Sequence, residues 1–185
     1  MSETAEDRAP VYDRPTRFLH WAVGGLVILL WLMAQGNSFL EKGPLRLGIW
    51  SVHVLLGFLL AALVVARLFW RGTRGDRLPP VQAGLWGHAA SAVHYLLYLL
   101  LIAVVVLGIM NVFGHGFPLF GVWKFPRFWE KPFQHWIAHW HGLAANIIAG
   151  VAAVHAVAAL WHHHVLRDGT LRRMWPARPD AGSRS

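Results

Sequence analysis

The sequence contains no cysteine. That absence excludes disulfides, thiolate metal sites, iron–sulfur clusters and the Cys-x-x-Cys-His attachment of c-type haem. Charge is also scarce, because only 14% of the 185 residues are charged, against about 25% in a typical soluble domain. Because cysteine is absent, any metal or prosthetic group must be held by His, Met or carboxylate side chains. Because charge is scarce, the chain has little polar surface to offer water.

Long stretches lack Asp, Glu, Lys and Arg altogether, and 56% of the residues are hydrophobic. Some of these stretches exceed the roughly 20 apolar residues that cross a bilayer as a helix. The sequence therefore predicts an all-α integral membrane protein, a four-helix bundle surrounded by lipid and formed by residues 1–185 as a single domain. The spans are predicted at residues 18–35, 47–70, 88–113 and 137–165, and disorder is predicted for residues 1–11 and 177–185.

The distribution of Lys and Arg predicts the orientation, because cytoplasmic loops carry an excess of both. With the N-terminus inside, twelve of the 17 basic residues lie on the inner side and five on the outer side. Both termini are therefore expected in the cytoplasm, and the aromatic loop over residues 114–138 is expected to cap the outer surface. The net charge of +8 follows this topology pattern, so we expect no nucleic-acid partner.

Four histidines in the apolar spans are the candidate site: His20, His53, His141 and His155. Polar side chains in membrane spans are costly and usually serve a function inside the bundle. The last two are 14 residues apart on one helix, which places them within about 40° of the same face and about 21 Å apart. The topology then predicts two pairs, His20 with His155 near the inner side and His53 with His141 near the outer side.

The donor inventory favours haem over a bare metal ion. Zinc and oxygen-activating iron usually need three or four protein ligands, often including carboxylates, and no Asp or Glu lies inside a predicted span. Two trans imidazoles with a porphyrin between them fit this inventory, and they favour electron transfer over oxygen activation. Gly57 and Gly142 leave room for a flat macrocycle, although either could instead serve close helix packing.

Other side chains are alternatives for the same chemistry. His139 lies about 160° around the helix from His155, and His94 could support a haem, line a proton route or pack. Met33 and Met110 could ligate iron, although thioethers more often fill apolar cores. His162 continues the stripe of His155 and could hydrogen-bond a quinone, or it could simply lie among headgroups with His163 and His164.

Four segments together resemble the bacterial cytochrome b561 family, and the first also resembles the cytochrome b subunits of nickel–iron hydrogenases. They are YDRPTRFLHW, HVLLGFLLAALVVARLFWR, HYLLYLLLIAVVVLGIMN and WHGLAANIIAGVAAVHAVAALWHHHVLRDGTLRRM. The resemblance covers residues 12–176 and implies a multi-pass protein of the bacterial inner membrane with two b-type haems. The axial ligands of the family fall on His20, His53, His141 and His155.

The resemblance also implies an oxidoreductase of the superoxide oxidase type. Such a protein takes electrons from superoxide outside and passes them to ubiquinone near the inner face. The quinone-contacting residues of that type fall on His162 and near Arg14, but its lysine between helices two and three has no counterpart here. The alternative is a cytochrome b subunit that links a periplasmic dehydrogenase or hydrogenase to the quinone pool.

Overall fold

The computed structural model describes residues 11–76, 78–79, 81 and 84–175. Its main elements are four long helices, namely α1 (Arg14–Ser38), α2 (Pro44–Thr73), α3 (Gly84–His115) and α4 (Lys131–Trp161). The all-α membrane-bundle prediction is confirmed. The disorder predicted for residues 1–11 and 177–185 falls, except at position 11, outside the described residues.

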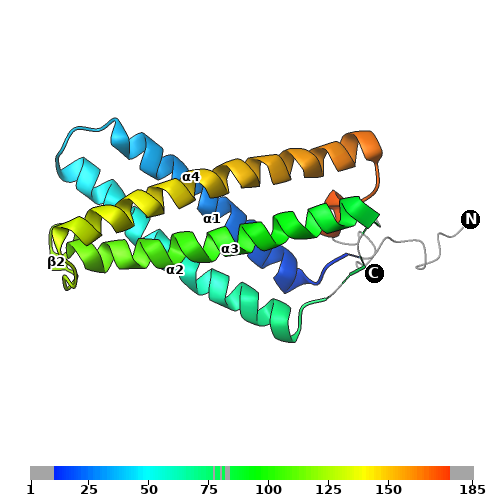
Figure 1. The fold of residues 1–185 in the computed structure, drawn as a ribbon, viewed down its shortest axis with the longest axis horizontal. Coiled ribbons are helices and arrows are strands. Elements are labelled where there is room, and N and C mark those ends of the chain that lie inside the picture. The colour runs from blue at the N-terminus through cyan, green and yellow to red at the C-terminus, as the bar shows by residue number, and fades with distance from the viewer. Residues whose placement is uncertain (1–10, 77, 80, 82–83, 176–185) are drawn as a thin grey trace, which may run out of the picture.

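Consecutive helices form two antiparallel pairs. α1 packs mainly against α2, and α3 packs mainly against α4. In Figure 1 the α1/α2 pair runs diagonally behind the α3/α4 pair. The connections within both pairs lie at one end of the bundle, which we call the hairpin end. The described chain termini and the α2–α3 connection lie at the opposite end, which we call the terminal end.

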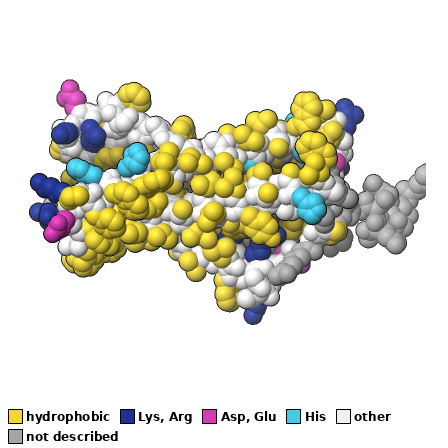
Figure 2. Space-filling model, viewed as in Figure 1, with side chains coloured by type: hydrophobic (Ala, Val, Ile, Leu, Met, Phe, Trp, Pro, Cys, Tyr) yellow, Lys and Arg dark blue, Asp and Glu magenta, His cyan; other side chains and the backbone are white. Residues whose placement is uncertain are grey.

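All four helices are long and apolar enough to cross a membrane. Only 11–17% of the most apolar 18-residue window of each is buried inside the bundle, so most of the hydrophobic surface faces outward. Figure 2 shows the same pattern, with hydrophobic side chains along the length of the bundle and Lys and Arg gathered near its ends. The small core is formed by Val23, Leu30, Leu60, Val64, Leu101 and Ile148. A lipid bilayer explains this arrangement, since the acyl tails of the lipids replace water around the outward-facing side chains.

All four helices begin earlier than predicted, α3 at Gly84 and not at residue 88. In the other three a proline lies in the first turn, where its missing N–H is not needed. α1 begins at Arg14 and not at residue 18, α2 at Pro44 and not at 47, and α4 at Lys131 and not at 137. The last third of the predicted outer loop, residues 131–138, is therefore helical. Asp13 also caps α1, accepting hydrogen bonds from the Thr16 backbone N–H (2.8 Å) and hydroxyl (2.7 Å).

The hairpin end is closed by the segment between α3 and α4. It contains a small antiparallel hairpin of β1 (Pro118–Leu119) and β2 (Trp123–Lys124). The hydroxyl of the fully buried Ser51 on α2 accepts the backbone N–H of Phe120 at 2.8 Å. Phe125 packs against Phe58 and Phe113 with ring centroids 6.0 and 5.4 Å away. The loop is therefore anchored on the hairpin-end half of α2 and on the end of α3.

The terminal end is tied together by hydrogen bonds between distant segments. The backbone N–H of Tyr12 donates to the Arg173 carbonyl, and Trp21 Nε1 donates to the Met174 carbonyl. The Asp13 carboxylate also accepts Trp70 Nε1 at 2.9 Å, which joins the start of α1 to the end of α2. The C-terminal residues of the described chain consequently lie against the N-terminal part of α1 and the residues just before it.

Candidate functional site

Two predicted histidines come together in the hairpin half of the bundle. His53 lies on α2 and His141 on α4, each about ten residues from the hairpin-end start of its helix. Their ring centroids are 6.5 Å apart, with an angle of 86° between the ring planes. Both side chains are half-buried, so the two imidazoles face each other across the space between helices that are not neighbours in sequence.

The backbone orients the His141 ring. Its Nδ1 lies 3.0 Å from the Val104 carbonyl, which can only accept, so Nδ1 carries the proton and Nε2 keeps its lone pair. Metal-ligating histidines characteristically donate the hydrogen of the non-ligating ring nitrogen to an acceptor such as this carbonyl. Gly108 makes room for the ring, since a Cβ there would lie 3.0 Å from His141 Cε1. The Nδ1 atom of His53 is also buried, and it has no hydrogen-bond partner in the described part of the chain.

A cavity of about 710 Å³ surrounds this pair, within the range of roughly 300–1,000 Å³ of known ligand and cofactor pockets. Its wall includes Gly57 and Gly142, and a Cβ added at either would meet no atom within 4 Å. Close helix packing therefore does not explain these two glycines in the described structure. They border open space, as a flat macrocycle beside the histidines would require.

The other two predicted histidines come together in the terminal half. His20 on α1 and His155 on α4 have ring centroids 6.3 Å apart at an interplanar angle of 74°. Arg67 on α2 reaches this pair, with one terminal nitrogen 3.3 Å from His20 Nδ1 and its Nε donating to the Tyr98 hydroxyl at 3.1 Å. A permanent cation therefore lies beside the second pair.

The spacing of both pairs fits a metal bound between them. With a metal–nitrogen bond of about 2.0 Å and each ring centre roughly 1.15 Å beyond its nitrogen, two trans imidazoles have centroids about 6.3 Å apart. The two observed separations are 6.3 and 6.5 Å. Among the described residues no cluster of three or more His, Asp or Glu could hold a metal ion. The remaining equatorial positions would thus be filled by a macrocycle and not by side chains.

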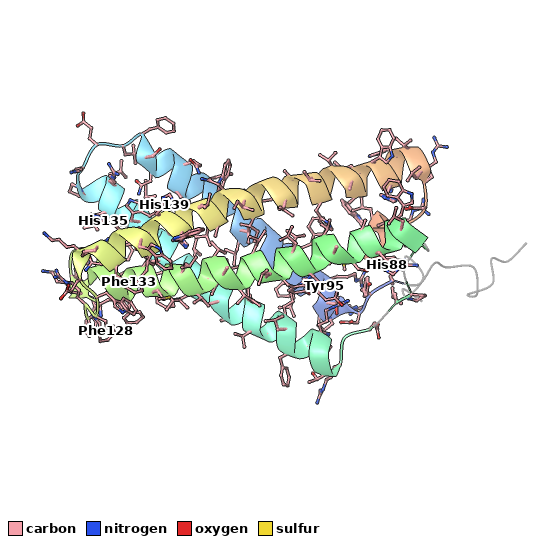
Figure 3. All side chains as sticks on the ribbon, in the orientation of Figure 1. His88, Tyr95, Phe128, Phe133, His135 and His139 are labelled. Carbon is pink, nitrogen blue, oxygen red and sulfur yellow. The ribbon has the colours of Figure 1, made fainter. Side chains whose placement is uncertain are left out.

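The alternative ligands lie in less suitable positions. His94 has its centroid only 5.4 Å from that of His155, closer than two trans ligands of one metal would be. His139 is exposed beside Trp140, and Figure 3 shows it with His135 near the hairpin end of α4. Neither Met33 nor Met110 lines the cavity around His53 and His141.

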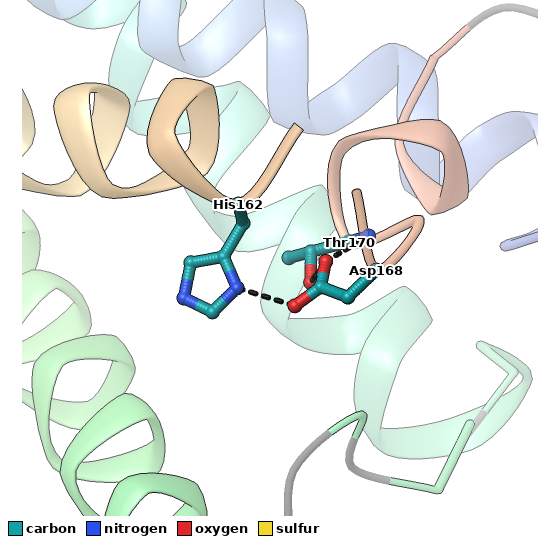
Figure 4. A network of polar contacts seen from close by, with 3 residues as sticks. All are labelled: His162, Asp168 and Thr170. Atoms are coloured by element: carbon teal, nitrogen blue, oxygen red, sulfur yellow. Dashed lines mark hydrogen bonds and ion pairs between the residues drawn. The ribbon is translucent and has the colours of Figure 1, made fainter. Parts of the chain in front are cut away.

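His162 lies at the terminal end, where α4 gives way to a π-helix, η2 (His162–Leu166). Its Nδ1 is 2.5 Å from a carboxylate oxygen of Asp168, and the other oxygen accepts the Thr170 N–H (3.0 Å) and hydroxyl (2.7 Å) (Figure 4). Burial would raise the pKa of Asp168, but the hydrogen bonds from Thr170 and His162 outweigh it and hold that pKa below its usual range. A carboxylate thus orients the imidazole.

Arg14, the other residue of the predicted quinone site, begins α1 and is exposed. No hydrogen bond or ion pair joins it to His162 within the described chain. Asp168, Val104, Gly108 and Tyr98 were not singled out from the sequence. Asp168 had a detectable signal, since it is the only carboxylate shortly after the last span. The other three depend on which helices meet, which spacing along one helix does not reveal.

Comparison with known proteins settles the family. A family model described as prokaryotic cytochrome b561 matches residues 11–177. The chain belongs to the prokaryotic cytochrome b561 family. It is 32% identical to cytochrome b562 of Cereibacter sphaeroides over 170 residues, covering 89% of this chain and 95% of that protein.

Two further relatives of this cytochrome b561-family chain have similar coverage. A probable superoxide oxidase CybB of Yersinia pestis is 31% identical over 85% of this chain and 92% of that protein. Cytochrome b561 homolog 1 of Escherichia coli is 31% identical over 90% and 98%. The family and the four apolar helices make the chain a multi-pass b-type cytochrome of the bacterial inner membrane, which carries haem b and transfers electrons.

Proposed function

We propose that this chain binds two haems b and moves electrons across the membrane, from superoxide at the hairpin end to ubiquinone at the terminal end. The observation that carries the proposal is the presence of two histidine pairs at two levels of one bundle. Their ring separations of 6.5 and 6.3 Å both suit two imidazoles on one iron. The two α4 residues are 14 positions apart, or about 21 Å along the helix axis.

In this proposal His53 and His141 hold one haem, and His20 and His155 hold the other. Bound haem b supplies one-electron chemistry, because its iron cycles between the ferric and ferrous states. If two histidines hold each haem in this way, the chemistry supplied would be electron transfer rather than oxygen binding. The Val104 carbonyl fixes the proton of His141 on Nδ1 and keeps Nε2 free to ligate.

Charge supports the hairpin end as the entry for a small anion. Its exposed basic residues outnumber its two glutamates, and Figure 2 shows Lys and Arg gathered there. The basic side chains are the exposed Lys42, Lys124, Arg127 and Lys131 and the half-buried Arg46. The cavity beside His53 and His141 continues to His115 and Pro118 near the same end. A positive field of this kind raises the encounter rate of anions and loses its effect as salt is added.

At the terminal end, His162 is the candidate proton donor to quinone. Asp168 accepts the hydrogen of its Nδ1, so the proton for quinone would be one that Nε2, facing away from the carboxylate, takes up from the aqueous side and passes on (Figure 4). Two superoxide anions lose one electron each and become dioxygen, while one quinone gains both electrons and two protons and becomes quinol. Arg14, at the same end of the bundle, is the second proposed quinone contact.

Stopped-flow spectroscopy tests this function on the purified, haem-loaded protein in nanodiscs. Mixing with superoxide should reduce the haems, added ubiquinone analogue should reoxidise them, and superoxide dismutase should abolish the reduction. Lys42→Glu with Lys124→Glu should slow reduction at low salt, because the positive field at this end becomes weaker. The fold should be kept, since the side chains of these exposed lysines make no described hydrogen bond or ion pair. Failure of superoxide to reduce either haem, while a dehydrogenase partner does so, would favour the electron-transfer subunit instead.

A further inference from the structure

The two histidine pairs differ in the charge around them. The cavity that holds the His53 and His141 rings has no Lys, Arg, Asp or Glu among its described lining residues. The His20 and His155 pair has Arg67 beside it, with a guanidinium nitrogen 3.3 Å from His20 Nδ1. Arginine stays protonated in proteins, so this is a fixed positive charge next to one pair only.

Arg67 is held in that position by its neighbours. Its Nε donates to the Tyr98 hydroxyl at 3.1 Å, and the guanidinium carbon lies 5.5 Å from the centre of the Tyr98 ring. One terminal nitrogen is buried without a hydrogen-bond partner. No ion pair links Arg67 to a carboxylate within the described ranges, so its charge is not compensated there by the protein.

The partners of the ring Nδ1 atoms also differ between the two pairs, an acceptor at His141 and a cation at His20. His141 Nδ1 faces a carbonyl oxygen, and an acceptor at this position makes an imidazole a stronger electron donor to a metal. His20 Nδ1 faces a guanidinium, which can only donate. The Val104 carbonyl therefore strengthens donation at one site. At the other site His20 Nδ1 has a fixed positive charge beside it where His141 Nδ1 has an acceptor.

We propose that Arg67 gives the His20/His155 haem a higher reduction potential than the His53/His141 haem, so that electrons run downhill from the hairpin end to the terminal end. This inference rests on the two-haem function proposed above. Its sign follows from electrostatics, because an iron that gains an electron loses one positive charge. A neighbouring cation therefore destabilises the ferric state more than the ferrous state.

The test is a spectroelectrochemical redox titration of the haem-loaded protein. Wild-type protein should show two one-electron steps, and His20→Ala should remove the higher one. Arg67→Gln should lower the higher midpoint, reducing the equilibrium constant for electron transfer between the haems about tenfold, which is 59 mV for one electron. Arg67→Lys keeps the charge and should keep most of the separation. Arg71→Gln removes an exposed charge one turn further along α2 and serves as the matched control.

Unchanged midpoints in Arg67→Gln, with both haems retained, would overturn the inference. If that variant loses the haem, Tyr98→Glu provides the second arm, because a carboxylate there would neutralise Arg67 without removing it. A lowered midpoint in Tyr98→Glu supports the inference. An unchanged midpoint contradicts it, and this is the result expected if a haem propionate already neutralises Arg67. A wild-type protein with a single haem would instead refute the two-haem function itself.

Discussion

Gly57 offers the sharpest test of what occupies the space beside His53. A Cβ at this position meets no atom within 4 Å, although the residue lines the cavity of about 710 Å³. Gly57→Leu should therefore fit the haem-free protein, and it should strengthen α2 by roughly 0.5–1 kcal/mol because glycine is a poor helix former. The same side chain would occupy room that the macrocycle needs.

The expected cost follows from overpacking, which typically amounts to about 1–3 kcal/mol. Assigned to the haem-bound state, that cost weakens binding at the His53/His141 site by about 5- to 150-fold. Gly25→Leu on the exposed side of α1 is the control, because it also meets nothing within 4 Å but borders no cavity.

The assay combines a pyridine haemochrome count per chain with the thermal unfolding of both variants. Gly57→Leu should fold with its full helix content and lose one of two haems, whereas Gly25→Leu should keep both. Retention of two haems in Gly57→Leu would refute the interpretation of the cavity.

Three further predictions concern single side chains. Gly108→Val should push the His141 ring from its place, since even a Cβ would lie 3.0 Å from Cε1, and should alter the low-spin spectrum of one haem; an unaltered spectrum would contradict this. Although burial alone would raise it, hydrogen bonds from Thr16, Asp76 and Trp70 lower the pKa of Asp13 to about 2. Asp13→Ala should therefore cost about 0.5–2 kcal/mol as a lost helix cap. The stabilisation by Asp13 is complete above the ordinary carboxyl pKa of 3.8 and should fade as pH falls towards 2. Equal acid sensitivity of the wild-type protein and the variant in thermal unfolding would refute this prediction. Asp168→Asn removes the charge that orients His162 and should slow quinone reduction while both haem spectra stay unchanged; an unchanged rate of quinone reduction would contradict a role for this contact.

Much of the fold follows from the sequence because a bilayer leaves few choices. Backbone groups in lipid must be satisfied within helices, so four charge-free stretches predict four helices. Exact ends follow less directly, since they depend on local chemistry such as the Asp13 cap and Pro132 in the first turn of α4. The helical last third of the 114–138 loop was missed for that reason.

The site was predictable to the extent that it repeats along a helix. His141 and His155 share a face by spacing alone, whereas the approach of Arg67 to His20 and of Val104 to His141 depends on contacts between helices. Those contacts join residues 47 and 37 positions apart in the chain. Periodicity within one helix carries no information about them.

The measurement closest to the central claim is a count of haem per chain in single histidine variants. Wild-type protein should hold two low-spin b haems, His53→Ala should lose one, and His20→Ala should lose the other, as distinguished by electron paramagnetic resonance and redox midpoint. One haem in the wild-type protein, or loss of the same haem in both variants, would contradict the assignment of two histidine pairs to two sites.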